Sequence, residues 1–92
     1  MKRTIIYKGY DLEVRVNPDC HKMALVTVRE IVRPTWKIFR TRYLGSGTFW
    51  VEDYKTIEDG ALAIIEHIIQ KMEKDDEIAK KWKDFEKEGL ID

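Results

Sequence analysis

The chain has 92 residues, of which 43% are hydrophobic and 37% charged, and its formal net charge is zero. This length and composition exclude several domains and a disordered chain, because they supply one hydrophobic core and a solvated surface. No stretch approaches the roughly 20 apolar residues of a membrane-spanning helix, and a single cysteine, Cys20, cannot form an intrachain disulfide. We therefore expect one small domain, residues 1–92, in the cytoplasm.

The zero net charge hides two halves of opposite sign. Residues 1–50 carry ten Lys and Arg against four acids, a net charge of +6, and residues 51–92 carry seven Lys against thirteen acids, a net charge of −6. A basic surface attracts phosphates or acidic proteins. The two halves can equally attract each other within the fold, so both interpretations stay open.

The first strands are predicted from alternation. Residues 11–16 alternate between apolar and charged side chains, which predicts a strand with one buried face. Residues 4–7 form its expected partner, across a tight turn that Gly9 makes possible. The next turn is predicted at residues 17–19, because Pro18 fixes φ between Asn and Asp.

Further strands complete the predicted sheet. Residues 23–32 have apolar side chains on both faces, which indicates a central strand or a bulge. A strand over residues 36–44 is followed by a predicted turn at Gly-Ser-Gly, residues 45–47, and a short return strand over 48–51. The sequence thus predicts an antiparallel sheet of three to five strands within residues 4–52, the basic half of the chain.

The acidic half, residues 53–92, changes to a helical period. Thr56 and Asp59 have the spacing of a capping box, which predicts a helix start. One continuous apolar face follows at helical spacing and is expected to pack on the sheet. Its members are Ile57, Ala61, Ile64, Ile65, Ile68, Ile69 and Met72. The fold class is therefore α+β, with a long helix over residues 57–73.

Asp75 interrupts this apolar face. It predicts the N-cap of a shorter second helix over residues 76–88, with Trp82 and Phe85 on one side. A single kinked helix over residues 57–88 is the alternative, because Trp82 stays in phase with the first apolar face.

Signals for an enzyme are poor. Ser46, the only serine, lacks the longer Gly-x-Ser-x-Gly setting of a nucleophile. Cys20 and His21 are adjacent, and His67 lies on the predicted helix, a set too small and too widely spaced for a zinc site. We interpret His67 as a partly buried structural residue, and we expect no catalytic residue, no metal and no cofactor.

Basic residues are interleaved with aromatic residues on the two strands predicted over residues 23–32 and 36–44. Guanidinium groups bind phosphates and exposed aromatic rings stack on bases, so this mixture suits nucleic acid. Alternatively, Trp36 and Ile38 belong to the core, and Arg40 and Arg42 then share their buried side. The candidate binding residues are Arg29, Lys37, Phe39, Arg40, Arg42, Tyr43 and Trp82.

The rival interpretation is a protein-binding module, such as an adaptor or inhibitor. An exposed strand could pair edge to edge with a partner or with a second copy in a homodimer. The acidic tail could instead dock through Trp82 and Phe85, unless these two rings close over the core. The sequence favours a non-enzymatic protein-interaction domain, with another protein or a nucleoprotein complex as the partner and nucleic-acid binding as the alternative.

The order of strands followed by a helix, entered through residues 54–60 (Tyr-Lys-Thr-Ile-Glu-Asp-Gly), resembles small sheet-plus-helix domains of phages and mobile elements. Some of these bind DNA through the sheet, as the amino-terminal arm domains of integrases do, and others are antitoxins or inhibitors of host defence. The resemblance is one of architecture, and it implies a binding role.

Overall fold

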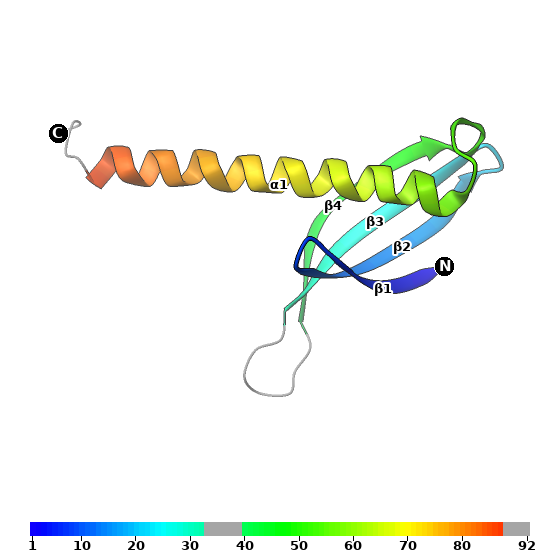
Figure 1. The fold of residues 1–92 in the computed structure, drawn as a ribbon, viewed down its shortest axis with the longest axis horizontal. Helices are drawn as coiled ribbons and strands as arrows, with labels where there is room; N and C mark the ends of the chain where they lie inside the picture. The colour runs from blue at the N-terminus through cyan, green and yellow to red at the C-terminus, as the bar shows by residue number, and fades with distance from the viewer. Residues whose placement is uncertain (33–39, 88–92) are drawn as a thin grey trace.

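The computed structural model describes residues 1–32 and 40–87, and these form an antiparallel sheet and a long helix (Figure 1). The α+β prediction is confirmed. The elements are β1 (Lys2–Tyr7), β2 (Tyr10–Cys20), β3 (Met23–Val32), β4 (Arg40–Trp50), the 3-10 helix η1 (Val51–Asp53) and the α-helix α1 (Ile57–Lys87). Neighbouring strands pair in the order β1-β2-β3-β4, so the described strands form a simple meander.

The β1–β2 hairpin has the predicted turn. Lys8 and Gly9 both have positive φ, 49° and 85°, which matches the right-handed twist of the flanking strands. Tyr7 pairs with Tyr10 at the hairpin end, and Ile5 pairs with Leu12.

Strand β3 is central and irregular, as predicted. It pairs with β2 on one side and β4 on the other. The register with β4 shifts between Val28, which pairs with Gly45, and Arg29, which pairs with Tyr43. Leu44 is the extra residue of this bulge, so β4 changes the face of alternate side chains there.

Two predicted turns are wrong. Residues 17–19 continue β2, where Pro18 pairs with Ala24 beside a second irregularity. Residues 45–47 lie inside β4, which therefore replaces the predicted turn and return strand with one long strand. The beginning of the predicted strand over 36–44 lies outside the described residues, and so do Trp36 and Ile38.

The glycines of β4 allow close packing of α1. A Cβ atom on Gly45 would lie 3.2 Å from Cγ2 of Ile68, and one on Gly47 would lie 3.1 Å from Cγ2 of Ile64. Glycine in a strand interior often marks such a close approach. The pattern continues at Gly60 of α1, where an added Cβ would overlap the ring of Phe49.

These contacts place α1 antiparallel to β4 and directly over it (Figure 1). Four residues of a helix advance about 6 Å and two residues of a strand about 6.6 Å, so the two repeats stay in step over three successive contacts. The other side of the buried helix face packs over β2 and β3. The buried core comprises Leu12, Val14, Val16, Ala24, Val26, Val28, Phe49, Ala61, Ile65, Ile68 and Ile69.

The long helix begins where the sequence predicts. The side chain of Thr56 caps it, because its Oγ1 accepts a hydrogen bond from the backbone N–H of Asp59 at 3.1 Å. Ile57 is an exception to the predicted apolar face, since 45% of it is exposed.

The predicted second helix is wrong. Among the described residues, α1 runs without interruption from Ile57 to Lys87, and Asp75 is an interior residue of it. From Asp75 onward, the side of the helix that faces the sheet carries polar residues, because the sheet no longer covers it. The backbone continues as helix. The last twelve residues of α1 then project beyond the sheet and give the molecule an extent of 55 Å along its longest axis (Figure 1).

Candidate interaction surfaces

The face of the sheet opposite α1 brings together two of the predicted binding residues. Arg29 and Tyr43 are cross-strand partners, and the guanidinium carbon lies 5.8 Å from the ring centroid of Tyr43. Arg29 also donates a hydrogen bond of 3.5 Å to Thr41, and the hydroxyl of Tyr43 donates one of 2.9 Å to Ser46. Within the described part of the chain, no element covers this face (Figure 1).

The remaining charges of this face are nearly balanced. Glu13 lies 3.8 Å from the ammonium group of Lys2 and 3.1 Å from Nε of Arg15, so one carboxylate serves both cations. Asp11 is a further acid on the same face, opposite Ile6 of β1. The basic residues that the structure describes in the first half of the chain are therefore not concentrated on this surface.

Arg42 lies on the other side of the sheet, facing α1. Its guanidinium is 3.1 Å from Glu30 and 3.6 Å from the sulfur of Met72. Arg40 is exposed two residues away at the start of β4. The structure thus separates the predicted arginines onto two faces, and the predicted binding residues Lys37 and Phe39 lie outside the described residues.

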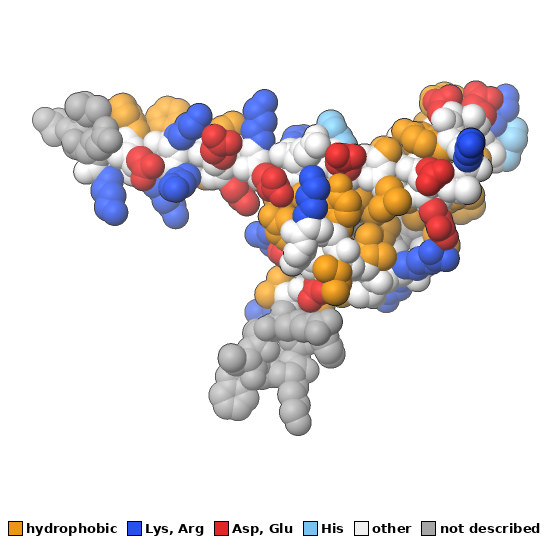
Figure 2. All heavy atoms as spheres, viewed as in Figure 1, with side chains coloured by type: hydrophobic (Ala, Val, Ile, Leu, Met, Phe, Trp, Pro, Cys, Tyr) orange, Lys and Arg blue, Asp and Glu red, His pale blue; other side chains and the backbone are white. Residues whose placement is uncertain are grey.

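Trp82 belongs to a different surface, the projecting part of α1. Trp82 is 61% exposed, and its ring meets the ring of Phe85 edge to face, with 5.9 Å between centroids. Ile78, one turn earlier, is 44% exposed. These three residues form an apolar stripe, Ile78–Trp82–Phe85, and hydrophobic side chains are visible along the edge of the projecting helix that points away from the sheet (Figure 2).

Charged residues of opposite sign border the apolar stripe. Lys74 and Lys81 occupy the helical row shared with Ile78 and Phe85, at positions i, i+4, i+7 and i+11. The row that contains Trp82 instead carries two acids, Asp75 and Glu86. Lys81 also lies 3.9 Å from Glu77, as the sequence spacing predicts.

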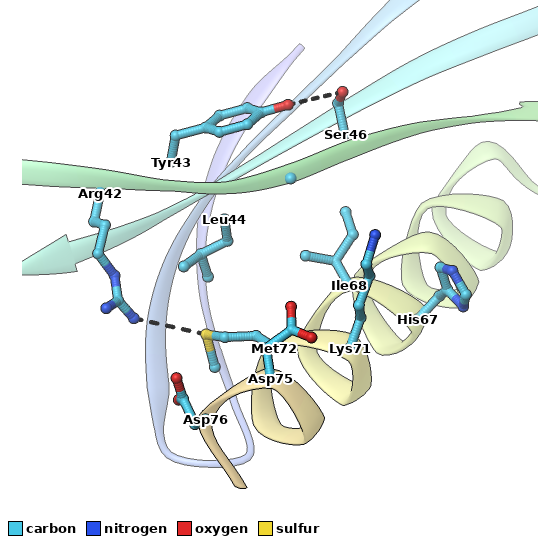
Figure 3. Close-up of a pocket in the computed structure, with 11 residues that line it drawn as sticks. Arg42, Tyr43, Leu44, Ser46, His67, Ile68, Lys71, Met72, Asp75 and Asp76 are labelled. Atoms are coloured by element: carbon cyan, nitrogen blue, oxygen red, sulfur yellow. Dashed lines mark hydrogen bonds between the residues drawn. The ribbon is translucent and has the colours of Figure 1, made fainter. Parts of the chain in front are cut away.

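A cleft of about 460 Å³ lies between β4 and α1, where α1 leaves the sheet. Residues 42–46 of β4 form one wall, and His67, Lys71 and Asp75 are among the helix residues of the other (Figure 3). His67 is exposed here, so its interpretation as a partly buried residue is wrong. The i, i+4, i+8 spacing of these three polar side chains could have predicted from the sequence that they share one side of the helix.

Tyr10, the first residue of β2, lies near Glu73 and Asp76 of α1. Partial burial raises the pKa of Tyr10, and the nearby carboxylates of Glu73, Asp76 and Glu30 raise it further. The neutral phenol is therefore favoured in the folded state.

A second cleft, of about 850 Å³, lies at the other end of the sheet and was not predicted from the sequence. Its lining is largely apolar and includes Pro18, Val51 and Ile57, with the exposed thiol of Cys20 at its edge. His67 lines the cleft beside β4 instead, so the structure does not bring it together with Cys20 and His21. In residues 1–32 and 40–87, no group of three or more His, Cys, Asp and Glu side chains is arranged to hold a metal ion.

No helix in the described part of the chain is long and apolar enough to cross a membrane. No protein-family model, curated protein or solved structure matches the chain.

Proposed function

We propose that this protein is a protein-interaction domain that inserts the projecting part of α1 into an apolar groove of another protein. The observation that carries the proposal is the exposed apolar stripe Ile78–Trp82–Phe85 on a helix that extends beyond its own sheet. The stripe has the i, i+4, i+7 spacing of the anchors that helices use in hydrophobic grooves. Trp is also the residue most enriched at the energetic centres of interfaces.

The charges beside the stripe define the partner further. A groove with acidic residues along one rim and basic residues along the other complements Lys74 and Lys81 on one side and Asp75 and Glu86 on the other. A second copy of this chain is a poorer occupant. The stripe Ile78–Trp82–Phe85 spans about one heptad, whereas stable coiled coils sustain the repeat over three or four.

Substitution at Trp82 separates binding from folding. Trp82→Ala is expected to change the free energy of unfolding by less than about 1 kcal/mol, because Trp82 is exposed and its ring contact within the described chain is the edge-to-face one with Phe85. A ring that closed the core would cost about 3–5 kcal/mol on truncation. Urea unfolding followed by circular dichroism measures the difference.

The binding test uses matched baits of the 92-residue chain. Wild type, Trp82→Ala, Phe85→Ala and the control Lys80→Ala, which lies away from the stripe, are compared by quantitative affinity capture. The proposal expects a protein that wild type and Lys80→Ala retain and both aromatic variants lose. Titration of that purified protein should then show a loss of about 30-fold or more in affinity for Trp82→Ala, as for an interface hot spot.

Two results would contradict the proposal. One is a captured partner that binds Trp82→Ala as well as wild type, and the other is a dimer in analytical ultracentrifugation that Trp82→Ala dissociates. The second result would assign the stripe to a second copy of the chain.

Nucleic-acid binding through the uncovered sheet face is a second candidate, favoured by the contact between Arg29 and the exposed ring of Tyr43. Because Glu13 pairs with both Lys2 and Arg15, we expect few phosphate contacts and a shallow salt dependence. Fluorescence anisotropy of labelled DNA and RNA at low and moderate salt tests this candidate. Steeply salt-dependent binding that Arg29→Glu weakens would favour nucleic acid over the helix-docking proposal.

A further inference from the structure

The outer edge of β4 is a second feature with the properties of a docking site. In the sheet that the described residues form, β4 is an edge strand of 11 residues. Alternate residues of such a strand direct their N–H and C=O groups away from the sheet. Because α1 lies directly over β4, the cleft of about 460 Å³ runs beside this edge (Figure 3).

We propose that an extended segment of another protein adds to β4 as a further strand and places alternate side chains in this cleft. Strand addition of this kind takes affinity from main-chain hydrogen bonds and specificity from the side chains that face the groove. Figure 3 shows Arg42 and Leu44 on the side of β4 toward α1, and Tyr43 and Ser46 on the other side. This site uses none of the three stripe residues Ile78, Trp82 and Phe85, although Asp75 borders both surfaces.

The helix wall defines the chemistry of the added segment. Lys71 and Asp75 are one helical turn apart, about 6 Å, which is close to the distance between side chains on the same face of a strand. Both are exposed, and none of the ion pairs among residues 1–32 and 40–87 uses either of them. The segment that fits carries an acidic residue opposite Lys71 and a basic residue two positions away opposite Asp75.

The order of the two charges depends on the direction of the added segment. Since α1 runs antiparallel to β4, a segment antiparallel to β4 runs parallel to α1. Such a segment carries the acidic residue before the basic one, and a segment parallel to β4 carries them in the reverse order.

A second copy of the chain fits this edge poorly. Pairing of β4 with its own copy would bring the two α1 helices, which lie directly over β4, against each other. The alternate residues of β4 that face α1 also include no acid to pair with Lys71.

The test is a selection from a displayed library of random seven-residue peptides, with the 92-residue chain as bait. The expected result is enrichment of an acidic and a basic residue two positions apart among β-forming residues. A selected peptide should shift the backbone amide resonances of residues 42–46 in nuclear magnetic resonance spectra. Replacing its central residues with proline should abolish binding, because proline cannot donate to the added strand.

Charge exchange identifies the site. Lys71→Glu should weaken the selected peptide about fivefold or more, and the double variant Lys71→Glu with Asp75→Lys should bind the peptide with its two charges exchanged. Both side chains are exposed, so these variants retain the core. Lys80→Glu is the matched control and should leave the affinity unchanged, as should Trp82→Ala, which separates this site from the helix-docking site.

No enrichment, or enriched peptides whose binding is insensitive to Lys71→Glu, would overturn the proposal. A peptide that binds without shifting the amide resonances of residues 42–46 would also overturn it. A symmetric dimer through β4, detected as concentration-dependent shifts of the same amides without peptide, would assign the edge to a second copy and also overturn it.

Discussion

At Gly60 the backbone of α1 lies against the ring of Phe49, which is 5% exposed. Replacement of glycine by alanine inside a helix usually stabilises it by up to about 1 kcal/mol. Here the added Cβ overlaps a buried ring, and overpacking costs about 1–3 kcal/mol. We expect Gly60→Ala to lower the free energy of unfolding by about 1–2 kcal/mol, measured by urea unfolding.

Gly47→Ala is the matched control for this prediction. Its Cβ would lie 3.1 Å from Cγ2 of Ile64, a half-buried side chain that can move by a few tenths of an ångström. The cost should therefore be smaller than that at Gly60. A Gly60→Ala variant as stable as wild type would mean that the Phe49 ring rotates away and that the close approach is not needed.

Tyr10 gives the fold a dependence on alkaline pH. Its pKa is raised in the folded state, so its contribution to stability is fully present below its ordinary pKa of 10.0 and is lost as the pH rises through the raised value. Between about pH 9 and about pH 11, the free energy of unfolding of wild type should fall more steeply than that of Tyr10→Phe. Equal slopes in urea unfolding across this range would show that Glu73 and Asp76 do not act on Tyr10.

At the scale of elements, the strands could be predicted where one face is buried and alternation is strict. Residues 11–16 have this pattern, and Leu12, Val14 and Val16 are buried as expected. The helix start at Thr56 could also be predicted, because a cap depends on neighbouring residues alone.

The wrong predictions share a physical cause, which is that they depend on packing partners far away in the sequence. Gly45 and Gly47 have the local chemistry of a turn, and only the position of α1 makes them strand residues that admit Ile68 and Ile64. Asp75 has the local chemistry of an N-cap, yet it marks the place where the sheet ends beneath a continuing helix. The candidate surfaces were predicted in part, because neighbouring residues of a strand alternate between faces: Arg29 pairs with Tyr43 on one face, and Arg42 pairs with Glu30 on the other.

Helix α1 should contain two parts of different stability. Residues 61–72 pack on the sheet, whereas residues 76–87 have few tertiary contacts, and an isolated helix of that length is marginal in water. Hydrogen exchange should show protection in residues 76–87 that is lower than in 61–72 by more than about tenfold. Equal protection at low protein concentration would mean that the projecting part is supported by contacts that the structure does not show.

At the scale of the molecule, the described parts of the two oppositely charged halves meet in one ion pair. Arg3 of β1 and Glu58 of α1 lie 2.7 Å apart and join the halves, while Lys2, Arg15 and Arg42 pair within the sheet. In the described chain, the basic residues of the sheet therefore pair with acids of the sheet more than with acids of the helix. Among residues 1–32 and 40–87, Lys71 and Asp75 form no ion pair and stay available to other molecules.

The projecting helix also sets the overall dimensions. The radius of gyration of the structure is 16.9 Å, whereas a compact chain of this length would have about 12 Å. Small-angle X-ray scattering of the 92-residue chain at low concentration should give a value near 16.9 Å. A variant shortened to residue 75 keeps the buried core and should fall toward the compact value. A radius near 12 Å for the full 92 residues would mean that the projecting part folds back and covers the Ile78–Trp82–Phe85 stripe, which would remove the basis of helix docking.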